Sequence, residues 1–91
     1  MSRILIVEDD LVIAEMIQKG LLQWGFDTYI ADDFQNVLAI FLKYDPHLLL
    51  MDISLPFYNG YYWCTEIRKI SKVPIIFLSS RADKMDIIMA I

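Results

Sequence analysis

Short apolar runs divided by segments of mixed polarity set the pattern of this chain. Three of them, Arg3–Val7, Leu48–Met51 and Ile75–Leu78, are rich in Ile, Leu and Val and are followed by polar residues. Such runs are typical of strands buried on both faces, which belong to parallel sheets covered by helices. A weaker alternation over Phe26–Ala31 predicts one more strand, second in chain order.

In the segments between these strands, apolar residues recur at helical spacing, which predicts helices. Asp10 is placed to cap a first helix, which ends at Gly25. Asp32 or Asp33 is placed to cap a second helix, which ends at about Tyr44. The apolar positions expected to face the sheet are Ile13, Met16, Ile17, Leu21 and Trp24 in the first helix and Phe34, Val37, Leu38 and Phe41 in the second.

Two further helices are predicted in the second half of the chain. One opens at Asn59-Gly60 and runs to about Ser71, and the last begins near Asp83 and continues to Ile91. The third helix should turn Trp63, Cys64, Ile67 and Ile70 inward. Alternating strands and helices with short connections predict right-handed βαβ units, and hence an α/β fold with a flavodoxin-like, doubly wound parallel sheet of strand order 2-1-3-4.

Composition narrows the classes of function. With 91 residues the chain forms one domain at most, and its net charge of −4 with scattered basic residues argues against nucleic-acid binding by this chain alone. No apolar run is long enough to cross a membrane and no signal-peptide pattern is present, so we expect a cytoplasmic protein. The single Cys64 and single His47 show no metal-ligand spacing, and we interpret them as a packing residue and a solvated loop residue.

Acidic residues follow two of the predicted strands. Glu8, Asp9 and Asp10 come after the first strand, and Asp52 comes after the third. An acid at such a place is often only a loop residue or a helix cap. In the order 2-1-3-4, however, strands one and three are neighbours, which brings Glu8, Asp9 and Asp52 together at the crevice where ligands bind in open α/β sheets.

Converging carboxylates need a positive partner. Two such charges about 4 Å apart repel by roughly 4 kcal/mol at an effective dielectric of 20. Oxygen-only ligands on loops favour Mg²⁺ over zinc or copper. A carboxylate oxygen can then attack phosphorus to form an aspartyl phosphate, and the Ser79 hydroxyl at the end of strand four could donate to a phosphoryl oxygen.

Together these segments resemble the receiver (CheY-like) domain of two-component response regulators. The resemblance rests on Glu8-Asp9-Asp10, on Asp52 to Gly60 with its Leu55-Pro56 and Asn59-Gly60 steps, and on Ile76 to Ser80. It implies that Asp52 accepts a phosphoryl group from a phosphohistidine of a sensor histidine kinase. It also implies that Glu8 and Asp9 hold Mg²⁺ with Asp52 and the Ser54 backbone carbonyl, and that Ser79 is the switch hydroxyl.

A narrower similarity concerns Gly60–Cys64 and Phe77–Arg81. These segments are similar to regulators that respond to bacitracin and other cell-envelope peptides and carry a winged-helix output domain. The resemblance therefore implies transcription regulation, with DNA bound only through an output domain outside this chain. It also implies a domain that is no enzyme beyond supporting its own phosphorylation and dephosphorylation.

The chain departs from the family near its end. Residues 1–91 correspond to a receiver domain that stops in the fourth helix, without the fifth strand, its lysine and the fifth helix, and Lys84 does not take the place of that lysine. Strand four would then be an unpaired edge, so we expect a fragment or association of two copies as a homodimer or by domain swapping. We expect metal binding to survive this loss, whereas phosphorylation and switching should be impaired.

Two other functions compete with the phosphorylated switch. One is a receiver-like interaction domain that is not controlled by phosphorylation. The other is a phosphatase that works through an aspartyl phosphate. Such enzymes usually need a second acid two residues after the nucleophile, where this chain has Ser54. The phosphorylated switch is therefore the favoured interpretation.

Overall fold

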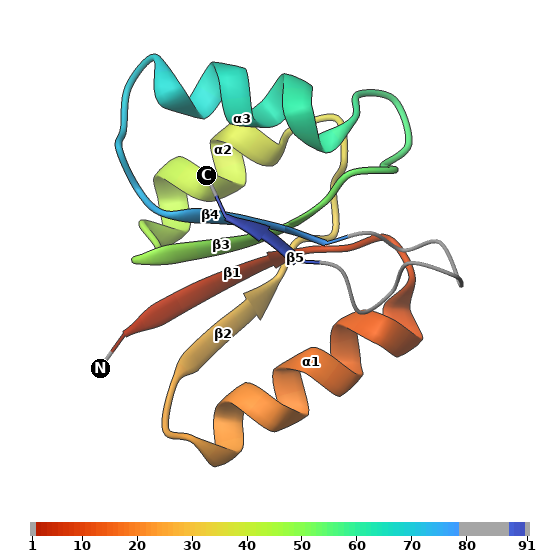
Figure 1. Cartoon of the computed structure of the whole chain (residues 1–91), viewed down its shortest axis with the longest axis vertical. Coiled ribbons are helices and arrows are strands. Elements are labelled where there is room, and N and C mark those ends of the chain that lie inside the picture. Colours follow the sequence, from red (N-terminus) through yellow and green to blue (C-terminus); the bar gives the residue numbers. More distant parts are fainter. Residues whose placement is uncertain (1, 79–87, 91) are drawn as a thin grey trace.

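The computed structural model describes residues 2–78 and 88–90 and shows a sheet between two layers of helices. The strands lie in the order β2-β1-β3-β4-β5, and β1 to β4 pair in parallel, which confirms the predicted order 2-1-3-4. Helix α1 covers one face, and α2 and α3 cover the other (Figure 1). The elements are β1 Arg3–Val7, α1 Leu11–Gln23, β2 Asp27–Ile30, α2 Val37–Tyr44, β3 Leu48–Asp52, α3 Gly60–Arg68, β4 Ile75–Leu78 and β5 Ile88–Ala90.

Strands β1 and β3 form the centre of the sheet, each paired on both sides. Their residues are buried on both faces, which explains why the sequence there is continuously apolar rather than alternating. Leu5, Val7, Leu49 and Met51 belong to the larger core under α2 and α3. Ile4, Ile6 and Leu50 belong to a smaller core under α1.

Helix α1 is capped as predicted but presents a different face. Asp10 Oδ1 accepts hydrogen bonds from the backbone N–H groups of the second and third helical residues, at 3.0 and 3.3 Å. Ala14 is the buried residue of the helix, with Ile17 and Leu21 packed beside it, whereas Met16 and Trp24 are exposed. Met16 lies about 200° around the helix from Ala14, so the prediction that it faces the sheet is wrong.

Helix α2 begins later than predicted. The Asp33 carboxylate accepts hydrogen bonds from the Gln35 backbone N–H at 3.1 Å and from the Asn36 side chain at 2.9 Å, and α2 starts only at Val37. An Asp that bonds to its own loop favours a turn over a helix, which explains the shift. The predicted end at Tyr44 is confirmed.

Helix α3 is shorter than predicted and ends at Arg68. Trp63 and Ile67 are buried as expected, and Cys64 packs against the same core. Ile70 is exposed, contrary to the prediction, because the helix has ended before it can continue the buried face.

Strand β5 replaces a predicted helical segment. Residues Ile88–Ala90 pair antiparallel with β4, so the prediction of a helix reaching Ile91 is wrong at these positions, as is that of an unpaired β4 edge. The edge of β4 offers hydrogen-bond partners to the backbone of these residues. A short helix without packing contacts would be only marginally stable, so strand pairing is favoured. The start of that helix near Asp83, and Lys84, lie outside the described residues.

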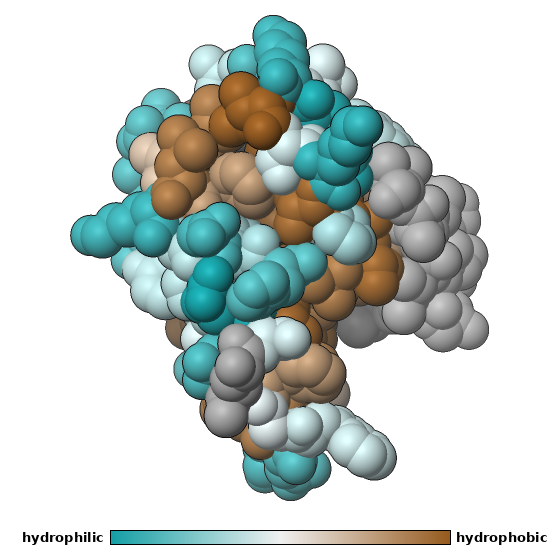
Figure 2. All heavy atoms as spheres, turned by 90° about the vertical axis from the view of Figure 1, so that its left-hand side faces the viewer, coloured by the Kyte–Doolittle hydropathy of each residue, from teal (hydrophilic) through white to brown (hydrophobic). Residues whose placement is uncertain are grey.

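The two ends of the sheet differ in character. Figure 2 looks at the end where the strands begin, and hydrophobic side chains gather in its upper part, over the α2 and α3 layer. The strands finish at the opposite end (Figure 1), where Glu8, Asp9 and Asp52 follow β1 and end β3. In the described part of the chain, no helix combines the length and the hydrophobicity that a bilayer crossing requires.

Candidate functional site

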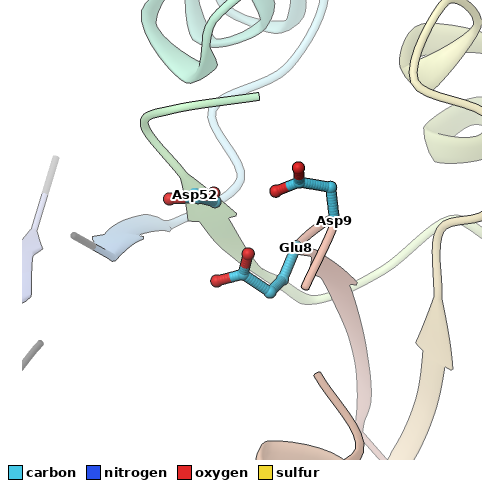
Figure 3. Close-up of side chains that lie close together, drawn as sticks. All are labelled: Glu8, Asp9 and Asp52. Atoms are coloured by element: carbon cyan, nitrogen blue, oxygen red, sulfur yellow. The ribbon is translucent and has the colours of Figure 1, made fainter. Parts of the chain in front are cut away.

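Three carboxylates meet where the central strands end. Val7 of β1 is in register with Met51 of β3, and the next residue along the chain is Glu8 after Val7 and Asp52 after Met51. Glu8, Asp9 and Asp52 each place an oxygen within 4.8 Å of the other two, and Figure 3 shows their side chains gathered from the ends of β1 and β3. The predicted convergence is therefore confirmed.

These carboxylates occupy different environments. Glu8 is 2% exposed and Asp52 is 0% exposed, whereas Asp9 is open to solvent. Burial raises the pKa of Glu8 to about 8, the backbone N–H of Asp10 opposes the shift, and the charge of Asp52 adds to it. Without a cation, Glu8 therefore remains largely protonated at neutral pH.

Backbone donors fix two of these side chains. Glu8 Oε2 accepts a hydrogen bond from the Asp10 N–H at 3.1 Å, and Asp52 Oδ1 accepts one from the Ser54 N–H at 3.3 Å. Asp10 itself caps α1 and is not a member of the cluster. The loops after β1 and β3 thus orient the acids without neutralising them.

This cluster fits a hard divalent cation. Glu8 Oε1 is buried and has no hydrogen-bond partner within the part of the chain that the structure describes. Once Glu8 is ionised, this buried oxygen has no donor, which is costly unless a cation satisfies it. The ligand atoms offered are all oxygens, and Asp9 leaves one side open to water, as Mg²⁺ coordination requires.

Gly60 sets how closely α3 approaches the acidic cluster. A Cβ atom at this position would lie 2.3 Å from the Asp52 carbonyl oxygen and 3.0 Å from Met51 Cγ. The Gly60 N–H donates to the Ile53 carbonyl at 2.9 Å, and the Asn59 side chain caps α3 by accepting from the Tyr62 N–H. The sequence analysis used the Asn59-Gly60 step as a helix start and as part of the family resemblance, and it did not predict this contact.

Three other sequence predictions have different outcomes. Ser54 contributes its N–H to Asp52, and the role of its carbonyl as a metal ligand stays a prediction. Ser79 lies outside the described residues, so its role as the switch hydroxyl also stays a prediction. His47 is exposed as expected, but its Nδ1 accepts a hydrogen bond from the Arg3 N–H at 2.9 Å, which joins the starts of β3 and β1.

Comparison with known proteins places this geometry in a family. Residues 4–91 match the family model for the response regulator receiver domain. The chain is 48% identical over 91 residues to the transcriptional regulatory protein YxdJ of Bacillus subtilis (strain 168), and the match covers all of this chain and 40% of YxdJ. The chain therefore spans about two fifths of the length of the curated relatives it matches.

Solved structures agree with this match. The N-terminal domain of the nisin resistance regulator NsrR, a lantibiotic response regulator, has a TM-score of 0.81 and 39% identity, with 96% of this chain and 74% of that chain covered. TrrA of Thermotoga maritima, solved in complex with Mg²⁺ and BeF, has a TM-score of 0.82 and 31% identity, with coverages of 91% and 73%. TrrA was also solved in complex with the histidine kinase ThkA, at a TM-score of 0.80, 31% identity and coverages of 88% and 70%. The chain belongs to the receiver-domain family of response regulators.

Proposed function

We propose that Asp52 is the phosphoacceptor of a signalling switch. The observation that carries this proposal is the convergence of the Glu8, Asp9 and Asp52 oxygens within 4.8 Å at the ends of β1 and β3. Asp52 is fully buried beside the start of α3, so a charge change there acts on packed structure rather than on a free loop. Support also comes from TrrA, which binds Mg²⁺ and BeF and forms a complex with a histidine kinase.

Glu8, Asp9 and Asp52, with the backbone carbonyl of Ser54, would hold Mg²⁺. When bound, Mg²⁺ neutralises negative charge on the carboxylates and on the phosphoryl oxygens. Glu8 must lose its proton to serve as a ligand, and its raised pKa makes cation affinity depend on pH.

Phosphoryl transfer requires little more than positioning from the protein. An oxygen of the Asp52 carboxylate attacks phosphorus while the phosphorus–nitrogen bond to a donor histidine breaks. The bonding electrons pass to the imidazole nitrogen, which is released from the phosphoryl group. The Ser54 N–H holds Asp52 Oδ1 in place for this attack, and the Ser79 hydroxyl would donate to a phosphoryl oxygen afterwards.

The names of two relatives support a biological output in transcription regulation. YxdJ is a transcriptional regulatory protein, and we place this chain in the same role, as the receiver part of a cytoplasmic regulator. A sensor histidine kinase supplies the phosphoryl group. DNA binding would belong to an output domain outside these 91 residues, and association of two copies would transmit the switch.

The test uses the full-length regulator that carries this domain, which is treated with acetyl phosphate and Mg²⁺ and examined by mass spectrometry and by amide NMR spectra with beryllofluoride. We expect one added phosphoryl group and shifted signals for Asp52, Ser54 and Gly60. The Asp52→Asn variant should show neither change. If the unaltered protein takes up no phosphoryl group and its amide signals do not shift when beryllofluoride is added, the proposal is wrong.

A further inference from the structure

A cavity opens between strand β2 and helix α2. It has a volume of about 360 Å³ and is lined by Tyr29 of β2 and by Ile40, Lys43 and Tyr44 of α2. This volume lies at the lower end of the range that small-molecule sites occupy. None of the four lining residues belongs to the acidic cluster, so the cavity is a separate feature of the fold.

The register of the sheet explains why the cavity is there. Tyr29 is in register with Leu5 of β1, and side chains in register on neighbouring strands lie on the same face of a sheet. Leu5 belongs to the core under α2 and α3, so Tyr29 faces the same layer. Helix α2 packs over β1, whereas β2 is the outer strand, and Tyr29 remains 42% exposed. The cavity therefore forms where α2 leaves the outer strand partly uncovered.

The walls of the cavity are aromatic and aliphatic. The Tyr29 and Tyr44 rings have centroids 5.5 Å apart and are tilted by 35° from one another, and Ile40 adds an aliphatic side chain. Aromatic rings pack against other rings in offset-stacked or edge-on arrangements that are worth more than the area they bury. A flat aromatic ring is therefore the apolar group that suits these walls.

Lys43 supplies positive charge at this cavity. It is the charged residue among those that line the cavity, and within the part of the chain that the structure describes it forms no ion pair. The charges of Asp27 and Arg3 also act on Tyr44, but these two residues are in register with each other and have opposite signs. Their charges largely offset one another, so an anionic ligand is favoured over a cationic one.

Tyr44 offers a hydrogen-bond donor without an acceptor. Its hydroxyl is buried and has no hydrogen-bond partner among the residues that the structure describes. Burial raises the pKa of Tyr44, the charge of Asp27 adds to this shift and the charge of Arg3 opposes it. The hydroxyl is therefore protonated at neutral pH, and leaving it without an acceptor costs free energy that a ligand oxygen could recover.

We propose that this cavity binds a small aromatic carboxylate. The ring packs against Tyr29 and Tyr44, and the carboxylate pairs with the Lys43 ammonium group and accepts a hydrogen bond from the Tyr44 hydroxyl. A neutral aromatic molecule would lack the charge for Lys43, and an aliphatic acid would lack the ring. The inference does not depend on the proposed function of Asp52.

Three ligands separate the two parts of this recognition. The full-length regulator that carries this domain is titrated at neutral pH with benzoate, with its neutral analogue benzamide and with acetate, and amide NMR spectra are recorded. We expect benzoate to shift the signals of Tyr29, Ile40, Lys43 and Tyr44 in a saturable way, with a Kd of about 1 mM. Benzamide should bind about fivefold more weakly, since it cannot form the ion pair, and acetate should cause no saturable shift.

Variants test the residues that the proposal assigns. Lys43→Met keeps the apolar stem of the side chain and should weaken benzoate binding about fivefold without changing benzamide binding, whereas Lys43→Arg should restore most of the affinity. Tyr29→Ala should weaken both ligands about fivefold, because it removes one aromatic wall. Lys19→Met is the matched control, since this exposed lysine lies on α1, on the opposite face of the sheet, and the change should leave both affinities unaltered.

Several results would overturn the proposal. They are the absence of saturable shifts at about tenfold the expected Kd, shifts confined to residues outside the cavity, and saturation by acetate alone. Equal affinities for benzoate and benzamide, or equal effects of Lys43→Met and Lys19→Met, would also refute it. Asp52→Asn should bind benzoate as tightly as the unaltered protein, so failure of phosphorylation and failure of ligand binding are observed separately.

Discussion

Replacing Gly60 with alanine tests how tightly α3 is seated against the acidic site. The added Cβ would stand 2.3 Å from the Asp52 carbonyl oxygen, so helix and strand must separate by about 1 Å to reach ordinary contact. Forcing a methyl group into packed structure costs about 1–3 kcal/mol. The same movement weakens the 2.9 Å hydrogen bond from the Gly60 N–H to Ile53, which adds about 1 kcal/mol.

Alanine also restricts the conformations of the unfolded chain, which raises the free energy of unfolding by about 0.5–1 kcal/mol. We therefore expect Gly60→Ala to lower the free energy of unfolding by about 1–3 kcal/mol, measured by urea denaturation without Mg²⁺. Gly20→Ala is the matched control, since nothing lies within 4 Å of its added Cβ on α1. That change should raise the free energy of unfolding by about 0.5–1 kcal/mol. Equal stability of Gly60→Ala and the unaltered protein would refute the packing argument.

Three further predictions concern the acidic site and its flanking helix. The pKa of Glu8 is raised from 4.5 to about 8, so the unfolded chain releases this proton at a lower pH than the folded protein does. The free energy of unfolding of the metal-free protein should therefore fall as pH rises from about 4.5 to about 8, by at most about 5 kcal/mol. Glu8→Gln should flatten this pH dependence in denaturation measured at several pH values. Asp52→Asn removes a charge that raises the pKa of Glu8, so in the absence of metal it should increase the free energy of unfolding at pH 8 by about 1–3 kcal/mol, while calorimetry shows weaker Mg²⁺ binding. Asp10→Ala deletes the cap of α1 and should cost about 1 kcal/mol by urea denaturation, whereas Asp10→Asn should cost little.

Each of these has a contrary result. A Glu8→Gln variant with the same pH dependence as the unaltered protein would remove Glu8 as its source. Destabilisation of Asp52→Asn at pH 8 without metal would show that repulsion is not the dominant effect of this carboxylate. Equal losses in Asp10→Ala and Asp10→Asn would mean that the cap hydrogen bonds contribute little.

Sequence patterns located the strands because burial on both faces leaves an unambiguous signal. β1 and β4 have the predicted bounds, and β3 extends one residue further, to Asp52 itself. The site followed from this, since strand order alone brings Asp52 beside Glu8. The close approach of Gly60 could not be predicted, because it depends on how far α3 descends toward the sheet.

The helices were less well predicted, for reasons specific to each. On α1, apolar character suggested that Met16 faces inward, whereas the small Ala14 is the side chain that lets the helix close on the sheet. On α2, Asp33 was expected to cap the helix and instead stabilises the preceding turn. For Ile88–Ala90, local propensity favoured helix, while the outcome depends on the edge of a strand distant in sequence.

The unequal cores on the two sides of the sheet have a consequence for motion. Among the described residues, eleven buried side chains form the core under α2 and α3, and four form the core under α1. Local opening free energy follows the apolar area that an element buries, so α1 should detach from the sheet more often than its neighbours. Amide hydrogens of α1 should then exchange with solvent through a partly open state, in which β1 and β3 remain protected.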